Sequence, residues 1–232
     1  YLHWPFCSAI CPYCDFNVHA AHKNTARQED WLAAYCSELT HAHGLRPHGL
    51  VKTVFFGGGT PSLMSGDLVA GILQEIDRLW GLTDDPEITL EANPVSAAQA
   101  HLQELRHAGI TRLSLGVQAF DDAALKLLGR THSANDAQHA FAAAQDIFDS
   151  ASFDLIYARP DQSLADWQKE LAAALTLAPQ HMSLYQLTIE PGTAFYARAQ
   201  QGRFHVPGED AAADLYEATQ NLCAAAGLPA YE

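Results

Sequence analysis

The chain has 232 residues, of which 48% are hydrophobic and 17% are charged, and its formal net charge is −14. These values indicate one large globular domain with a sizeable core, and no run of about 18 apolar residues could span a membrane. The 27 acidic and 13 basic residues include no Lys/Arg cluster. Such a field repels phosphate backbones, which argues against a nucleic-acid partner.

The ends and the cysteines of the sequence indicate its context. The chain begins without Met and stops without a closing element, so we expect a fragment of a longer protein. No charged segment followed by an apolar core marks a secretory signal. Of the five cysteines, three are clustered, which is typical of a metal site in a reducing compartment. We therefore expect residues 1–232 to form one domain of a cytoplasmic protein.

The cysteine cluster directly follows a short apolar run that we expect to be the first strand. Cys7, Cys11 and Cys14 are separated by three and two residues, so one tight loop can turn all three sulfur atoms toward one centre. The loop is too short for disulfides among them. Two sites fit this pattern: an iron–sulfur cluster with one iron left open, or a zinc ion completed by His3 or His19. The cysteines alone do not decide between them.

Strand and helix patterns alternate along the rest of the chain. After the first strand at 1–4, strands are expected at 51–56, 87–90, 112–117, 152–157 and 182–188. Helices are expected at 29–43, 67–80, 121–128, 134–148, 164–178 and 210–226, with one more between a capping box at Ser96 and Gly109. Residues 83–86 and 190–193 are expected as turns. This alternation predicts an α/β domain with a parallel sheet, either open or closed into a full or partial barrel.

Glycines and polar residues follow three of the expected strands. Residues 57–61, Gly-Gly-Gly-Thr-Pro, have neither the spacing of a dinucleotide loop nor the Lys-Ser/Thr of a P-loop. Glu91 and Asn93 follow the next strand, and Gln118 follows the one after it. Because the carboxyl ends of parallel strands meet at one rim, where α/β domains bind ligands, these residues predict a ligand site.

Eight stretches together resemble the radical S-adenosylmethionine (SAM) proteins of the HemN/HemW group, in the same order and at similar spacing. They are YLHWPFC at 1–7, CDF at 14–16, GGGTPS at 57–62, LEANP at 90–94, LGVQAF at 115–120, GRTH at 129–132, FDLIY at 153–157 and SLYQLTIEPGT at 183–193. The resemblance covers nearly the whole chain. Most of these motifs are weak alone, and their combination is specific.

The resemblance implies a partial (β/α)6 barrel and two cofactors. A [4Fe–4S] cluster is expected on Cys7, Cys11 and Cys14, with SAM chelating the open iron. Matching positions that line the SAM site are Tyr1, Gly58, Gly59, Thr60, Glu91, Gln118, Arg130 and Asp154. Glycines permit close approach of a ligand, carboxylates receive an amine or hydroxyls, and arginine pairs with a carboxylate. The C-terminal domain of the group is expected to lie outside this chain.

Two positions depart from the group's usual pattern. Relatives with porphyrinogen oxidase activity carry a fourth cysteine two positions after the third, where this chain has Phe16. The Asp-Phe form resembles the HemW branch of heme chaperones. Where the group usually has Gly-Leu-Pro-Gly, this chain has Ala158-Arg159-Pro160-Asp161. We expect these replacements to change the loop, because a glycine there can hold positive φ, and to alter the mouth of the SAM cavity.

The resemblance therefore implies two functions. The first is a heme chaperone that binds heme and transfers it to an acceptor protein, and Phe16 favours it. The alternative is an oxygen-independent coproporphyrinogen III dehydrogenase, which needs an electron donor and forms a radical from SAM. A radical enzyme acting on RNA is disfavoured by the net charge. The heme ligand is expected beyond this chain, and the histidines at 3, 19, 132 and 181 are interpreted as structural.

Overall fold

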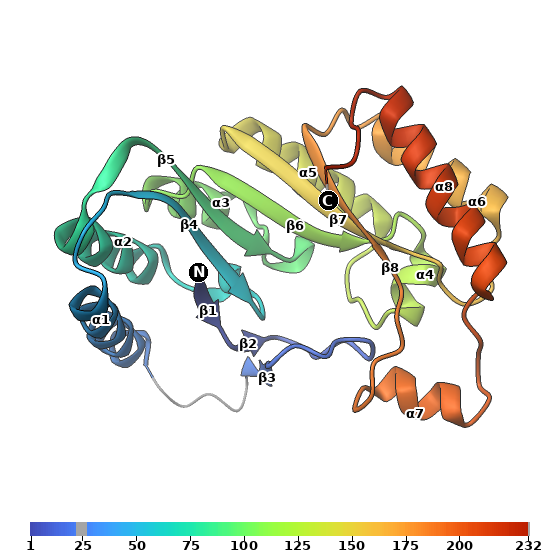
Figure 1. Cartoon of the computed structure of the whole chain (residues 1–232), viewed down its shortest axis with the longest axis horizontal. Coiled ribbons are helices and arrows are strands. Elements are labelled where there is room, and N and C mark those ends of the chain that lie inside the picture. Colours follow the sequence, from blue (N-terminus) through green and yellow to red (C-terminus); the bar gives the residue numbers. More distant parts are fainter. Residues whose placement is uncertain (22–26, 232) are drawn as a thin grey trace.

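The computed structural model describes residues 1–21 and 27–231, and six parallel strands form its central sheet (Figure 1). In spatial order the strands are β1 (Leu2–Trp4), β4 (Val51–Gly58), β5 (Leu82–Ala92), β6 (Arg112–Gln118), β7 (Ser150–Tyr157) and β8 (His181–Gln186). Each strand pairs with the preceding strand of this sheet, and β1 and β8 are its two edges. This order confirms the expected α/β fold, a partial (β/α)6 barrel with all its strands parallel.

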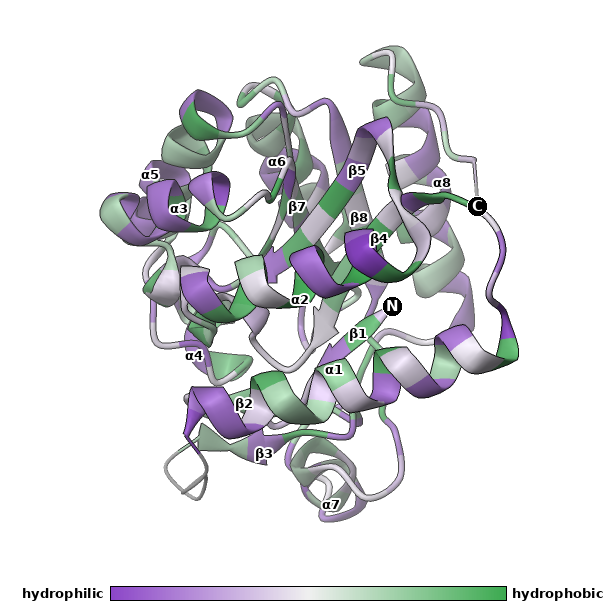
Figure 2. Cartoon of the chain, turned by 90° about the vertical axis from the view of Figure 1, so that its left-hand side faces the viewer, coloured by the Kyte–Doolittle hydropathy of each residue, from purple (hydrophilic) through white to green (hydrophobic). Residues whose placement is uncertain are grey.

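Helices connect successive strands and cover the outside of the sheet, except that the last two follow the final strand and the first of these two lies apart from the sheet (Figure 1). They are α1 (Gln28–Leu45), α2 (Gly66–Trp80), α3 (Gln99–His107), α4 (Asp122–Leu127), α5 (Ala134–Ile147), α6 (Leu164–Leu175), α7 (Ala194–Gln200) and α8 (Glu209–Ala225). α1 packs on α2, and α8 packs on α6. Figure 2 shows hydrophilic and hydrophobic residues mixed along α1 and α2; α2 turns one apolar face toward the protein, with Leu68, Val69, Ile72 and Ile76 buried, whereas α1, described over Gln28–Leu45, has no fully buried residue. Within the described residues, no helix has the length and apolarity needed to cross a membrane.

The hydrophobic core lies between the sheet and these helices. It combines strand residues that face the helices with apolar faces of the helices. Among its residues are Phe56, Leu90, Leu113, Leu115, Phe153, Ile72, Leu102, Phe141 and Trp167. All of these side chains are almost fully buried. Strands buried on both faces are typical of parallel sheets. The core therefore fixes the strands from outside and leaves their carboxyl ends free to carry a site.

Two local predictions from the sequence are wrong. Ser96 does not open α3, because its hydroxyl donates to the carbonyl of Asn93 and ends a short 3₁₀ helix at Pro94–Ser96. α3 begins at Gln99, without a side-chain cap. The residues 83–86, expected as a turn, belong to β5. Val51 pairs with Leu82 and Thr53 with Glu87, so these residues bulge out of the ladder.

Two features, a second small sheet and a short helix, were not expected from the sequence. β2 (Phe6–Cys7) and β3 (His19–Ala20) form a second, two-stranded parallel sheet at either end of the cysteine loop. α7 follows the turn at 190–193, where Thr193 accepts a hydrogen bond from the Tyr196 amide as N-cap. Both elements are short and depend on contacts with distant residues. The backbone amide of Phe195 donates to Pro12, which joins α7 to the cysteine loop.

Candidate functional site

The start of the cysteine loop is held against the end of β4. β1 pairs with β4, and beyond this pairing the amide of Gly59 donates to Trp4 and the amide of Thr60 donates to Phe6. The aromatic rings of Trp4 and Phe6 also pack edge-on against Trp31 of α1. The backbone that leads into Cys7 is therefore fixed to the end of β4 and to α1.

The glycine run makes this close contact possible. A Cβ on Gly59 would lie 2.6 Å from the carbonyl oxygen of Phe6, and one on Gly58 would lie 2.5 Å from the ring of His3. Gly58 also has φ of +111°, which side-chain-bearing residues rarely adopt. These glycines were expected to admit a ligand. In the structure, the absence of side chains at Gly58 and Gly59 allows β1 and β2 of the same chain to lie directly against them.

One cavity of about 390 Å³ brings together the predicted cysteines and nearly all the predicted SAM-site residues. It lies at the carboxyl ends of the strands, as expected for this architecture. Its lining includes Cys7, Cys11, Cys14, Gly58, Gly59, Thr60, Glu91, Gln118, Arg130 and Asp154. Tyr1 does not line it. The exposed Tyr1 ring stacks on Phe55 beside Gly57, and partial burial of its hydroxyl, followed by the Glu91 carboxylate, raises the Tyr1 pKa.

The three thiols share one electrostatic environment. Burial raises the pKa of Cys7 and of Cys14, and the neighbouring thiols raise both further. The guanidinium Nη1 of Arg130 lies 3.4 Å from the sulfur of Cys11, and its Nη2 donates to the carbonyl of Gly116 at 2.6 Å. Its Nε is buried without a hydrogen-bond partner among the described residues. The arginine is therefore fixed beside the thiols with its Nε–H still available as a donor.

This donor set fits an iron–sulfur cluster. Thiolates are the usual ligands of such clusters, and an adjacent guanidinium offsets their negative charge. In the part of the chain described, no three His, Cys, Asp or Glu side chains are arranged to hold a single metal ion. Both ring nitrogens of His3 are engaged, Nε2 with the carbonyl of Asn17 and Nδ1 with the hydroxyl of Tyr1. His3 is therefore not placed to complete a zinc site.

Two carboxyl groups on neighbouring parts of the rim have raised pKa values. Burial raises the pKa of Glu91 to about 7; the amide of Gly58, 3.1 Å from its Oε2, opposes this shift, and Asp154 adds to it. Burial raises the pKa of Asp154 to about 6, against hydrogen bonds from Ser183 and Ser114. A nearby cation stabilises the ionised form of such buried carboxyl groups. SAM carries an ammonium and a sulfonium, so its charge fits this cavity.

Gln118 lies at an irregularity of the sheet. Gly116 pairs with Asp154 and Gln118 with Leu155, so Val117 interrupts the β6–β7 ladder. Gln118 itself has φ of +74°, a conformation that is costly for a residue with a side chain. The strained residue is thus one of those that line the cavity.

The structure adds lining residues that the sequence did not single out. They come from the cysteine loop and from the end of β8 with the segment after it: Ile10, Tyr13, Val18, Tyr185, Gln186, Leu187, Thr188 and Glu190. The strand-end rule could have found the β8 group, because residues 183–193 also matched the family. The side chain of Phe16, at the position of the fourth cysteine, is 64% exposed.

The histidine of the GRTH motif has a structural role. His132 is buried, and its Nε2 lies 3.0 Å from the carbonyl oxygen of Val117. Burial lowers its pKa to about 4, and Arg130 adds to this shift, so the imidazole is neutral and donates this hydrogen bond. His132 does not line the cavity of the cysteines. This agrees with its interpretation from the sequence.

The loop at 158–161 does not form the mouth of the SAM cavity, and this expectation is wrong. Arg159 is only 5% exposed and lines a different cavity, of about 560 Å³, between α4, α5 and α6. Ala158 and Asp161 have φ of +55° and +60°. The two positions where the group usually has glycine therefore keep the backbone conformation that favours glycine.

Comparisons with known proteins agree with this geometry. The family model described as "Radical SAM superfamily" matches residues 1–174. The mouse mitochondrial radical S-adenosyl methionine domain-containing protein 1 is 41% identical over 236 residues, and the Escherichia coli heme chaperone HemW is 39% identical over 233 residues. Both alignments cover all of this chain. The chain spans 52% of the mouse protein and 60% of the bacterial one.

A solved structure has the same fold. The coproporphyrinogen III oxidase HemN from Escherichia coli, described as a radical SAM enzyme, superposes with a TM-score of 0.82 and 25% sequence identity. The superposition covers 98% of this chain and 52% of that one. The radical SAM family implies a [4Fe–4S] cluster and SAM as cofactors. With the family model matching three quarters of its length, the chain belongs to the radical SAM superfamily.

Proposed function

We propose that this chain is the radical SAM core of a heme chaperone, which binds a [4Fe–4S] cluster and SAM and passes heme to an acceptor protein. The observation that carries the proposal is the single cavity that joins three thiols, Arg130 and two carboxyl groups with raised pKa. Relatives that are named heme chaperone HemW match the whole chain at 36 to 39% identity.

Each residue of the cavity has a part in this proposal. Cys7, Cys11 and Cys14 hold the cluster, which supplies an open iron for SAM and an electron when it is reduced. The proposed SAM-binding residues are Gly58, Gly59, Thr60, Glu91, Gln118, Arg130 and Asp154, and Tyr1, which the resemblance also implied, is left out because it does not line the cavity. The carboxyl groups of Glu91 and Asp154 would receive the amine or hydroxyls of SAM, and the backbone of Gly58 to Thr60, which lines the cavity, would permit its close approach. Arg130 balances the charge of the thiolates beside Cys11.

Apolar side chains at the cavity support heme or porphyrin as the cargo. Ile10, Phe16 and Tyr185 line the cavity, yet between 51 and 64% of each is exposed. Exposed apolar residues that lie together mark a binding surface, and a porphyrin presents a flat apolar face. Phe16 stands where relatives with oxidase activity have a thiol, which favours the chaperone. The axial heme ligand is proposed to lie in sequence outside this chain.

A second candidate is an oxygen-independent coproporphyrinogen III dehydrogenase. The structural match to HemN favours it, because that protein is a coproporphyrinogen III oxidase. In this case the protein needs an electron donor, and the cavity residues orient the substrate propionate and exclude water. In either case we propose a reducing compartment such as the cytoplasm, because free thiols persist there. No nucleic-acid partner is proposed, given the net charge of −14.

The deciding experiment uses the full-length protein with its cluster rebuilt under anaerobic conditions. SAM, a reductant and coproporphyrinogen III are supplied, and porphyrin products are measured by mass spectrometry, with Cys7→Ala as control. We expect no decarboxylated product above the control, and a stable complex when hemin is added to the same preparation. Decarboxylated product that depends on Cys7 would reject the chaperone and establish the dehydrogenase.

A further inference from the structure

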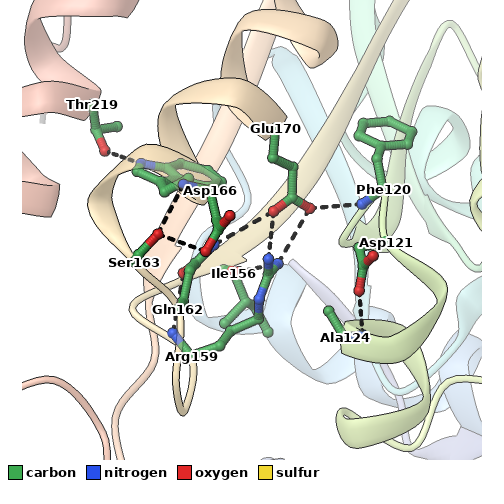
Figure 3. A network of polar contacts seen from close by, with 11 residues as sticks. Phe120, Asp121, Ala124, Ile156, Arg159, Gln162, Ser163, Asp166, Glu170 and Thr219 are labelled. Carbon is green, nitrogen blue, oxygen red and sulfur yellow. Dashed lines mark hydrogen bonds and ion pairs between the residues drawn. The ribbon is translucent and has the colours of Figure 1, made fainter.

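A buried ion pair lies outside the SAM cavity, where it lines the separate cavity between α4, α5 and α6 (Figure 3). Arg159 follows β7, Glu170 lies on α6, and the two side chains are 7% and 9% exposed. Both Nη atoms of Arg159 donate to the Glu170 carboxylate. Gln162 adds a contact of 3.4 Å to the same carboxylate and accepts from the Arg159 amide at 3.2 Å. The pair is therefore enclosed and almost fully hydrogen-bonded, which a buried pair needs to be stable.

Each partner also holds the backbone of a strand end. Arg159 Nη1 donates to the carbonyl of Ile156 at 3.0 Å, and Glu170 Oε1 accepts from the amide of Phe120 at 2.8 Å. Ile156 is two residues beyond Asp154 in β7, and Phe120 is two residues beyond Gln118 of β6. Figure 3 shows Glu170 between the guanidinium and the Phe120 amide. The pair thus bridges the carboxyl ends of β6 and β7.

This bridge lies where the regular ladder stops. The β6–β7 pairing shifts register between Gly116 and Gln118, and no pairing of β6 follows Gln118. Gln118 is held at φ of +74°. A strained residue keeps its conformation only when its surroundings hold it. The carboxylate of Glu170 is the acceptor that fixes the chain just after this residue.

We propose that Arg159 and Glu170 are positioning residues for the SAM cavity: their ion pair fixes the ends of β6 and β7 and so sets the place of Gln118 and Asp154. The proposal rests on the proposed function of that cavity. Neither residue touches the cavity of the cysteines, so they act through the backbone of Phe120 and Ile156. Hydrogen-bond partners of metal ligands change affinity about 10- to 100-fold when they are removed, and we take the lower end of this range as the effect expected here.

The test compares two double variants of the full-length, cluster-loaded protein. In Arg159→Leu/Glu170→Leu the Phe120 amide loses its acceptor. In Arg159→Leu/Glu170→Gln an amide oxygen still accepts that hydrogen bond, and no lone charge is left buried. The matched control is Arg106→Leu/Asp149→Leu, because Arg106 likewise pairs with a carboxylate and donates to the carbonyl of Ile110, before β6. The control pair joins the amino ends of β6 and β7, away from the cavity.

SAM affinity is measured by equilibrium dialysis, and the EPR spectrum of the reduced cluster is recorded with and without SAM. We expect the first variant to bind SAM roughly tenfold more weakly and the second to return to within about threefold of wild type. The control is expected to match wild type. Equal SAM affinity in all variants, whatever their melting temperatures, would overturn the positioning role alone. A wild type that binds no SAM would overturn the proposed function and this role with it.

Discussion

Glu91→Gln gives the most direct electrostatic test of the candidate site. Burial raises the pKa of Glu91 from 4.5 to about 7. The folded protein therefore binds a proton that the unfolded chain releases between these two pH values. Stability is lost as pH rises through this window, and the full loss is present above pH 7. A shift of this size corresponds to about 3 kcal/mol, and the glutamine variant carries none of it.

The assay is urea unfolding of the cluster-free protein at pH 5 and pH 8. We expect Glu91→Gln to exceed wild type in free energy of unfolding at pH 8 by about 2 to 3 kcal/mol and to differ much less at pH 5. Glu104→Gln is the matched control. Glu104 also accepts from a glycine amide, Gly66, but its pKa is lowered by His101, so the sign is opposite. A Glu91→Gln variant whose pH dependence equals that of wild type would refute the reasoning.

Three further variants test other contacts. Gly59→Ala is expected to cost about 1 to 3 kcal/mol in urea unfolding, because its Cβ would meet the carbonyl of Phe6; wild-type stability would contradict the proposed close contact. Trp167→Phe removes the indole donor to Thr219 and is expected to cost about 1 kcal/mol and to speed amide exchange in α8; unchanged exchange would contradict this. Phe16→Ala is expected to leave stability within about 0.5 kcal/mol and to weaken hemin binding in a titration; unchanged hemin affinity would argue against the apolar surface.

Most residues that line the cavity could be predicted, because the strands all run in the same direction. Parallel strands bring their carboxyl ends to one rim, so Glu91 and Gln118 had to lie near the glycine run once the alternation of strands and helices was recognised. Cys7, Cys11 and Cys14 needed only a loop after β1. These features depend on spacing along the chain, which the sequence contains directly.

The contacts that hold the site could not be predicted, because they join residues that the sequence does not relate. The pairing of Arg159 with Glu170 depends on the exact angle between the loop after β7 and α6. From the sequence, Arg159 was placed at the mouth of the SAM cavity, and the structure places it in a different cavity, between α4, α5 and α6. The role predicted for Gly58 and Gly59, close approach of a ligand, was also incomplete. Their close neighbours in the structure are His3 and Phe6 of the same chain.

The first residues of the helices could likewise be predicted only where their capping contacts are local. Ser96 has the sequence of a capping residue, but its hydroxyl contacts Asn93 and also Ser62, which is distant in the chain. Ser133 and Asp121 cap α5 and α4 through local hydrogen bonds. Local capping follows from sequence when no distant residue competes for the same hydroxyl.

Iron and sulfide analysis, with EPR spectroscopy of the anaerobically rebuilt protein with and without SAM, tests whether the three cysteines hold a [4Fe–4S] cluster that binds SAM. We expect about four irons per chain and a reduced-cluster spectrum that changes when SAM is added. Cys7→Ala, Cys11→Ala and Cys14→Ala are each expected to lose the cluster. A stable single metal ion on these cysteines, or a cluster whose spectrum ignores SAM, would contradict the proposed site.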